Sequence, residues 1–343
     1  MTITQKIPLW LDCDPGHDDM IAILLSAFHP NINLVGLSSV FGNSTLPNTT
    51  FNLLSLITGL NKLEIPVYQG NEFPLNYPAK KPSTAPGIHG DNGLGGHRLP
   101  RPINKAQSID QFYQDLAAKL ELYDGELSIA AVGPLTNIAD FFRKYPDCKS
   151  LVKYISIMGG GIGIYNFKGH GEFNIWNDPT AANFLFQDPI LRHKVLLSPL
   201  NVTHTLILNT TIQHLIYNKD QYEDDPFRRF LSDLMIFFAE SYKKNQEFPD
   251  GPPIHDPIAV YVLLVKYGIL GDSQWKESNL ELHVDEQING EKEGEISVGL
   301  ESGPNDPSVI FGVDVQLFWD QVLEVIRLAD VHLKDSGAKI DYD

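Results

Sequence analysis

The feature that most restricts the fold is a repeated order of short apolar runs and helical patterns. Five runs are brief, rich in β-branched residues or leucine, and bounded by Gly, Pro or Asn, as buried strands are: Ile7–Cys13, Leu34–Val40, Leu127–Val132, Tyr154–Met158 and Val195–Leu197. Helical patterns occupy the segments between and after them, at Asp18–Phe28, Leu46–Leu60, Ile109–Leu122, Thr136–Arg143 and Pro179–Phe186. Strands joined through helices pair in parallel, so the order predicts an α/β fold with a mostly parallel, Rossmann-like central sheet flanked by helices.

Two segments interrupt this order. Residues 71–105 are rich in Pro and Gly, and residues 159–177 open with a run of glycines. Loops of this length in a compact domain usually have a functional role or are disordered. After about residue 200 the pattern becomes more helical and includes short strand-like pieces and a closing helix near Val315–Ala329. Because no linker or repeat is visible, we expect one domain over residues 1–343 with C-terminal helical and short-strand elaborations.

Charge and composition restrict the partners. The chain carries 43 acidic and 26 basic residues, a formal charge of −17, which disfavours nucleic acid and anionic membrane surfaces and leaves small molecules or cations. The opening MTITQKIPLW lacks the apolar core of a signal peptide, and no run approaches the ~20 apolar residues of a membrane span. Two isolated cysteines fit a reducing compartment. We therefore expect a cytoplasmic protein, with the nucleus as an alternative location.

Four aspartates fall within eight positions at the end of the first predicted strand and just after it. Asp12 and Asp14 point to the same side of that strand, because side chains alternate with period two, and they leave it at its carboxyl end. Open α/β sheets place their ligands at this end. A Pro-Gly pair then makes a turn, and Asp18 and Asp19 fall in the first turn of the next helix. All four carboxylates can thus face one small volume.

Four like charges at such distances repel by several kcal/mol unless a cation lies among them or some stay protonated. Oxygen ligands without cysteine or paired histidine favour Ca²⁺ or Mg²⁺ over zinc. A helix cap would explain Asp18 but not the other three aspartates. Two other classes of protein remain open at this point. A Mg²⁺-dependent phosphatase of the haloacid dehalogenase type also begins with a strand ending in D-x-D, and a calcium-binding protein without catalysis would need the same carboxylates.

Two later stretches supply further candidates. In PPIHDPIAVYVLL, Asp256 precedes a proline as a helix N-cap would, and His255 next to it adds an acid–base group. In GEFNIWNDPTAANF, Asp178 is again a plausible cap, whereas Glu172 and Asn174 alternate onto one side of a predicted extended segment. Their acceptors and donors suit vicinal hydroxyls. The alternative is that Glu172 and Asn174 only bond the backbone of the loop.

Together these stretches resemble the nucleoside hydrolase family, whose members cleave the N-glycosidic bond of ribonucleosides. The resemblance covers nearly the whole chain and is most similar to fungal uridine or inosine–uridine nucleosidases. It is carried, in the family's order, by DCDPGHDD, VFGN at 40–43, GIHGDNGLGG at 87–96, AVGPLTNIA at 131–139, MGGG at 158–161, NFKGHGEFNIWNDPTAA at 166–182 and PIHDPIAV at 253–260. The resemblance implies the nucleoside hydrolase fold, a ribonucleoside substrate, and a homodimer or homotetramer that serves pyrimidine and purine salvage.

The resemblance also implies a role for individual residues. It assigns Ca²⁺ binding to the carboxylates of Asp14, Asp19 and Asp256 and to the backbone carbonyl of Val132, with Asp12 orienting water on the metal. The implied substrate contacts, mostly to ribose hydroxyls, are Asp18, Asn43, Met158, Asn166, Glu172, Asn174 and Asp256. The implied contacts to the base are His89 and His255.

The implied chemistry passes through an oxocarbenium-like transition state, as glycoside hydrolysis does. Calcium would hold the ribose 2′- and 3′-hydroxyls and a water, and Asp14 would take that water's proton as it attacks the anomeric carbon. His255 would be the general acid for the departing base, because an unperturbed histidine has a pKa of about 6.5. The products would be ribose and free base, with uridine and/or inosine favoured.

Some features are left without an assignment. Four aromatic residues precede His255: Phe237, Phe238, Tyr242 and Phe248. Their pattern fits either a lid over the base or the side of a helix that packs into the core. Tyr242 is a candidate contact to the substrate. Asn201 stands where many relatives carry Asp and receives no site role. The nine histidines other than His89 and His255, among them His17 inside the aspartate motif, also receive none. The order of bases, and whether residues 71–105 become ordered on substrate binding, stay open.

Overall fold

A central eight-stranded sheet organises the computed structural model, which describes residues 6–337 except 223, 224, 247 and 272. The strand order is β3-β2-β1-β4-β5-β6-β10-β7, and all neighbours pair in parallel except β10 and β7. The strands are β1 (Ile7–Cys13), β2 (Ile32–Ser39), β3 (Val67–Gln69), β4 (Ser128–Ala131), β5 (Ile155–Met158), β6 (Val195–Ser198), β7 (Trp275–Asn279) and β10 (Ser308–Val313). The predicted mostly parallel α/β sheet is confirmed.

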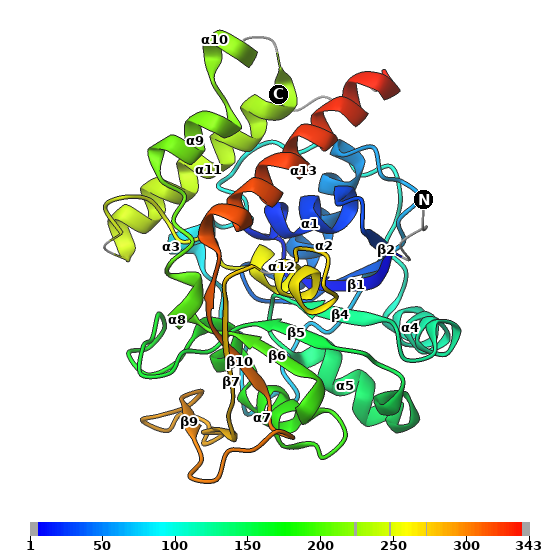
Figure 1. Cartoon of the computed structure of the whole chain (residues 1–343), viewed down its shortest axis with the longest axis vertical. Helices are drawn as coiled ribbons and strands as arrows, with labels where there is room; N and C mark the ends of the chain where they lie inside the picture. Colours follow the sequence, from blue (N-terminus) through cyan, green and yellow to red (C-terminus); the bar gives the residue numbers. More distant parts are fainter. Residues whose placement is uncertain (1–5, 223–224, 247, 272, 338–343) are drawn as a thin grey trace.

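Helices cover both faces of this sheet (Figure 1). One face packs against α1 (Asp19–Phe28), α2 (Leu46–Gly59), α12 (Pro257–Lys266) and α13 (Val315–Ser336). The other face packs against α4 (Ile109–Tyr123), α5 (Thr136–Lys144) and α7 (Pro179–Gln187). Along β1, Leu9 and Leu11 belong to the first core and Trp10 to the second, which is why this strand is apolar at nearly every position.

The remaining elements connect these strands and helices along the chain. They are α3 (Pro86–His89), α6 (Phe173–Asn177), α8 (Leu200–Thr203), α9 (Thr210–Ile216), α10 (Lys219–Tyr222), α11 (Pro226–Asn245), the 3₁₀ turns η1 (Pro146–Ser150) and η2 (Arg192–Lys194), and a two-stranded sheet of β8 (Leu282–Val284) and β9 (Ile296–Val298). Within the described ranges, none of the helices combines the length and apolarity needed to cross a membrane.

The predicted helices match the observed ones to within one residue at each end, except for the last. That helix, α13, continues past the predicted Ala329 to Ser336 and ends where Gly337 adopts a left-handed φ of 61°. The short strand β3 (Val67–Gln69) was not predicted, because three residues are too few to show a period. β10 and β7 extend the same sheet, so the C-terminal part of the chain is built onto the predicted core.

The loop of residues 71–105 is fastened to the body of the protein. The Lys80 ammonium lies 2.8 Å from the Glu293 carboxylate and 3.0 Å from the centroid of the Trp176 ring, and both charged side chains are buried. The backbone N–H of Leu75 donates to Asp178. These contacts attach the loop, which also contains α3, to the segment around Trp176 and Asp178 and to Glu293.

Candidate active site and metal centre

A cavity of about 270 Å³ opens at the carboxyl end of the sheet. This volume is slightly below the ~300–1,000 Å³ of drug-sized ligand sites, which suits a compact ligand. Eleven of the residues predicted from the sequence line it: Asp18, Asn43, His89, Val132, Met158, Asn166, Glu172, Asn174, Tyr242, His255 and Asp256. The three other predicted residues, Asp12, Asp14 and Asp19, are buried next to it. The fold therefore gathers these side chains from segments far apart in the sequence.

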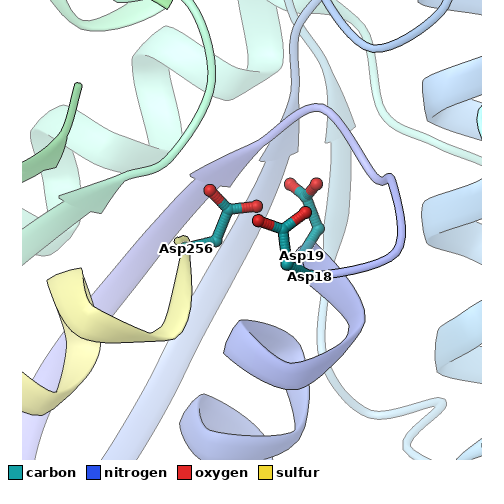
Figure 2. Close-up of side chains that lie close together, drawn as sticks. All are labelled: Asp18, Asp19 and Asp256. Atoms are coloured by element: carbon teal, nitrogen blue, oxygen red, sulfur yellow. The ribbon is translucent and has the colours of Figure 1, made fainter. Parts of the chain in front are cut away.

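Three buried carboxylates converge beside the cavity. Figure 2 shows Asp18 and Asp19 at the start of α1 and Asp256 at the start of α12, with their carboxylates turned toward one another. One oxygen from each lies within 4.8 Å of the other two. Asp18 and Asp256 occupy the N-cap positions of their helices, yet neither makes a side-chain capping bond. The capping explanation considered for both residues therefore does not account for where their carboxylates point.

Asp14 is buried next to this group, and one of its carboxylate oxygens makes no hydrogen bond within the described part of the chain. Its Oδ2 accepts the backbone N–H of Asn43 at 2.7 Å, whereas its buried Oδ1 has no hydrogen-bond partner among the described residues. Gly133 lies against it, and a Cβ there would come within 2.6 Å of Oδ1. The Asp14 backbone N–H in turn donates to Asp19 at 3.1 Å. An unpartnered buried carboxylate oxygen is costly, so it points to an absent ligand.

Asp12 supports the cluster from the sheet. Its Oδ1 accepts hydrogen bonds from Asn137 Nδ2 at 2.7 Å and from the Ser38 hydroxyl, while the buried Oδ2 has no partner in the described part of the chain. Burial raises the pKa of Asp12 to about 7, against the opposing effect of these two hydrogen bonds. That Asp12 orients water on a metal ion stays a prediction.

Burial raises the pKa of every carboxyl in the cluster. Burial is the larger cause for Asp14, Asp18 and Asp256, and neighbouring carboxylates add to it. The pKa of Asp18 rises to about 7. Burial also raises the pKa of Asp19, although backbone N–H groups oppose it. Without a cation the site cannot hold its full negative charge at neutral pH, so this all-oxygen donor set fits a hard divalent metal ion.

Amide and carbonyl groups form another part of the cavity lining. Val132 follows β4, and its carbonyl accepts Asn174 Nδ2 at 2.8 Å, which leaves the second lone pair of that oxygen for another partner. Asn174 Nδ2 also lies 3.3 Å from the carbonyl of Met158. Asn166 Oδ1 accepts the backbone N–H of Phe173 at 3.0 Å. Hydrogen bonds within the protein therefore fix the side chains that face the cavity.

The prediction of an extended segment around Glu172 was wrong for the residues that follow Glu172. α6 begins at Phe173, and Glu172 is its N-cap, with carboxylate oxygens that accept the backbone N–H groups of Asn174 at 3.1 Å and Gly160 at 2.8 Å. A five-residue helix among glycines is too short to show a helical period in sequence. Glu172 therefore has the structural role that the alternative interpretation gave it, and it also lines the cavity.

His255 lies in a chain of three side chains. Its Nε2 is 2.8 Å from the Tyr242 hydroxyl, and its Nδ1 is 2.8 Å from the Thr203 hydroxyl. Burial lowers the pKa of His255 well below its usual value, and nearby histidines lower it further. The expectation that His255 titrates near neutrality, which assumed an unperturbed pKa, was therefore wrong. Sequence reasoning missed Thr203, which lies in the PLNVTH segment two residues beyond Asn201.

Asn201 has a structural role. Its amide oxygen accepts the backbone N–H of Ile162 at 2.9 Å, and its amide nitrogen donates to the Ile162 carbonyl at 3.0 Å. An aspartate could make only the first of these bonds. Asn201 therefore clamps the glycine-rich loop that borders the cavity.

Three of the four aromatic residues, Phe237, Phe238 and Tyr242, belong to α11, and Phe248 follows it. Phe238 and Tyr242 are buried in the main core, and Tyr242 also lines the cavity. Burial raises the pKa of Tyr242 well above its usual value, and the nearby carboxylates raise it further. Burial lowers the pKa of His89, which also lines the cavity, to about 3. Both groups are thus neutral at physiological pH, and they act through hydrogen bonds.

Comparison with known proteins relates this geometry to one family. The family model described as inosine-uridine preferring nucleoside hydrolase matches residues 9–320. A uridine nucleosidase from Saccharomyces cerevisiae is 42% identical over 341 residues, which cover 96% of this chain and 98% of the relative. A pyrimidine-specific ribonucleoside hydrolase from a Shewanella species is 31% identical over 330 residues, covering 94% of this chain and 96% of the relative.

Solved structures agree in fold. A purine-preferring ribonucleoside hydrolase from Gardnerella vaginalis superposes with a TM-score of 0.83 at 26% identity, over 94% of this chain and 99% of that one. An inosine-guanosine nucleoside hydrolase superposes with a TM-score of 0.78 at 22% identity, over 93% of this chain and 98% of that one. The predicted fold is therefore confirmed in its topology and in its likeness to these enzymes.

Proposed function

The chain belongs to the family of inosine-uridine preferring nucleoside hydrolases, and from this premise we propose that it uses Ca²⁺ to hydrolyse ribonucleosides, uridine and/or inosine foremost, to ribose and free base. Family membership makes it an N-glycosidase and sets aside the phosphatase and the non-catalytic calcium-binding protein. The observation that supports the cation site is the position of two N-cap carboxylates. Asp18 and Asp256 make no capping bonds, and their carboxylates converge on Asp19. The cytoplasmic location and the homodimer or homotetramer stay predictions.

The proposed Ca²⁺ ligands are the carboxylates of Asp14, Asp19 and Asp256 and the carbonyl of Val132. Their donor atoms are all oxygen, as calcium prefers, and the unpartnered Asp14 Oδ1 and the second lone pair of the Val132 carbonyl are available to a cation. When bound, Ca²⁺ would neutralise the cluster, hold vicinal hydroxyls and lower the pKa of a water. Asp12 would orient that water from behind.

The ribose would lie in the cavity, in contact with both carboxylate and amide side chains. Asp18, Asn166 and Asn174 line the cavity with acceptors and donors that suit hydroxyl groups. Glu172 adds a carboxylate that backbone N–H groups already hold in place. Asn43 donates from Nδ2 to the Asp14 carbonyl and to Asp19, both at 3.1 Å, so it also fixes the acidic turn while facing the cavity. Such support keeps the site preorganised.

The carboxylates serve the bond-breaking step. As the bond to the base lengthens, positive charge develops on the ribose ring, and the buried carboxylates stabilise it. Asp14 accepts a proton from the attacking water on Oδ1, which makes no hydrogen bond within the described part of the chain and has one lone pair for the cation and another for the proton. The crowding of acids in DCDPGHDD is thus explained by the charge of the transition state as well as by the cation.

The departing base needs a proton donor on its own side of the cavity. His255 is the predicted general acid, yet both of its ring nitrogens are bonded, Nε2 to Tyr242 and Nδ1 to Thr203. The Tyr242 hydroxyl lines the cavity. In this proposal Tyr242 gives its proton to the base as the C–N bond breaks, neutral His255 donates a hydrogen bond from Nε2 to the phenolate oxygen that is left, and the phenolate takes a proton from solvent after the base departs.

Ribose release tests the reaction. Separate incubations with uridine, cytidine, inosine, adenosine and uridine monophosphate, with Ca²⁺ supplied, are expected to release reducing sugar from one or more nucleosides, with uridine or inosine fastest. Asp14→Asn is the negative control. Release of phosphate from the monophosphate with no sugar from any nucleoside would contradict the proposal.

Tyr242→Phe tests the proton transfer to the base. Loss of the hydroxyl is expected to lower kcat for uridine by about 10²-fold, the lower range of general acid catalysis. The ribosidic bond of p-nitrophenyl β-D-ribofuranoside, whose leaving group needs no proton, should break at nearly the wild-type rate. Tyr267→Phe, a tyrosine bonded to Ser128 away from the cavity, is the matched control. Equal losses on both substrates would mean that Tyr242 does not protonate the base.

A further inference from the structure

His17 is buried inside the acidic motif and is not among the proposed ligands or substrate contacts. Its backbone N–H lies 3.3 Å from His89 Nδ1, and its own ring Nδ1 lies 3.2 Å from the same atom. Two groups of His17 therefore converge on one nitrogen of a histidine that lines the cavity. The arrangement requires a glycine at position 16, because a Cβ there would collide with the His89 ring.

The backbone N–H decides where the protons of both rings lie. It can only donate, so His89 Nδ1 must be an acceptor and carry no proton. His17 Nδ1, facing the same bare nitrogen, must then be the protonated one. A neutral imidazole holds one proton, so His89 carries its proton on Nε2, and the buried Nε2 of His17 is bare. That atom has no partner among the described residues, which suits a bare nitrogen better than an N–H group.

The His17 ring has little freedom to turn away. It lies parallel to Phe237, with centroids 5.2 Å apart and planes at 7°, and to Phe238, at 5.3 Å and 9°. Both phenylalanines come from α11, the helix that also carries Tyr242. Packing of this kind locks a side chain into one rotamer. His17 thereby joins α11 to α3, the short helix that ends at His89.

We propose that His17 is a positioning residue that holds His89 as its Nε2–H form and directs this N–H into the cavity, toward an acceptor atom of the nucleobase. The acceptor is a carbonyl oxygen or a ring nitrogen without a proton, as uracil and hypoxanthine both offer. Nε2 is on the ring edge away from His17, and no described residue occupies it. The ligand in this proposal rests on the proposed function, whereas the protonation of the two rings does not.

The protonation pattern is tested without substrate. Nitrogen-15 NMR of the ring nitrogens in the full chain, with His89 and His17 assigned through His89→Gln and His17→Asn, reports which nitrogen of each ring carries hydrogen. The expected result is Nε2–H for His89 and Nδ1–H for His17. A proton on His89 Nδ1 would overturn the proposal, even if the enzyme hydrolyses nucleosides as expected.

The effect on recognition is tested by two substitutions at His17. His17→Phe keeps an aromatic ring against the two phenylalanines but removes the donor, and it should lower kcat/KM for uridine about fivefold, the value of one neutral hydrogen bond. His17→Asn places an amide nitrogen where Nδ1 was, and it should restore most of that loss. Hydrolysis of p-nitrophenyl β-D-ribofuranoside, which has no nucleobase, should change less than twofold in either variant.

Two outcomes would contradict the role of His17. If both variants lose the same activity on both ribosides, His17 supports only the fold, and a parallel drop in Tm would identify that cause. If His17→Phe leaves uridine hydrolysis unchanged, its side chain does not position His89. A wild-type enzyme that hydrolyses no nucleoside would instead overturn the proposed function and leave the NMR result valid.

Discussion

Replacing Asp14 with asparagine is expected to lower kcat for nucleoside hydrolysis by about 10³-fold, within the range of a lost general base. Asparagine has the same shape, so it fits beside Gly133, where the space next to Asp14 is tight. Its amide oxygen can still accept the Asn43 N–H. What it loses is the negative charge and the free oxygen that takes the proton from water.

The experiment separates catalysis from cation binding. Steady-state kinetics of Asp14→Asn should be measured at Ca²⁺ concentrations high enough to offset a weaker site, with Ca²⁺ binding measured by calorimetry on the same sample. Asp233→Asn, an exposed aspartate on α11, is the matched control and should behave as wild type. Full activity in Asp14→Asn with Ca²⁺ bound would remove Asp14 from the reaction.

Removing Ca²⁺ with a chelator is expected to abolish activity and to lower the Tm. The cation-free cluster holds several buried carboxyls whose pKa burial and repulsion raise, and a bound cation relieves that cost. At a Ca²⁺ concentration of about 1,000 times the Kd, binding stabilises the folded state by about 4 kcal/mol, so the Tm should fall by several degrees on its removal.

Metal add-back identifies the ion. Ca²⁺ should restore both activity and Tm, whereas Mg²⁺ at the same concentration should restore less, because Mg²⁺ requires octahedral geometry at ~2.0–2.1 Å and releases its waters reluctantly. Asp256→Asn should show the same losses as chelation and should not respond to Ca²⁺. A chelated enzyme that keeps its activity and Tm would exclude the cation from the mechanism.

The elements that the sequence predicted well are those with strong local signals. Buried apolar runs and amphipathic periods located β1 and α1 within one residue, and the aspartates between them followed from the geometry of a strand, a turn and a helix start. Asp178 was predicted to cap a helix, and it does accept the backbone N–H of Ala181 at 3.0 Å. Rules about neighbouring residues are enough to predict the structure where a side chain interacts only with residues close to it in the sequence.

The failures lie where a residue has two purposes or a distant partner. Asp18 and Asp256 stand at N-cap positions, and only the fold reveals that their carboxylates turn to each other instead. His255 has an ordinary pKa in isolation, and burial beside Tyr242 and Thr203 changes it. The pairing of His17 with His89 spans 72 residues, and no spacing rule in the sequence indicates it.

A crystal grown with Ca²⁺ and D-ribose would test the central claim most directly. We predict an ion among the carboxylates of Asp14, Asp19 and Asp256 and the carbonyl of Val132, at about 2.3–2.6 Å from each oxygen, with two ribose hydroxyls completing its shell. Asp18 and Asn174 should face the same sugar. An ion bound elsewhere, or a ribose that does not touch it, would contradict the account.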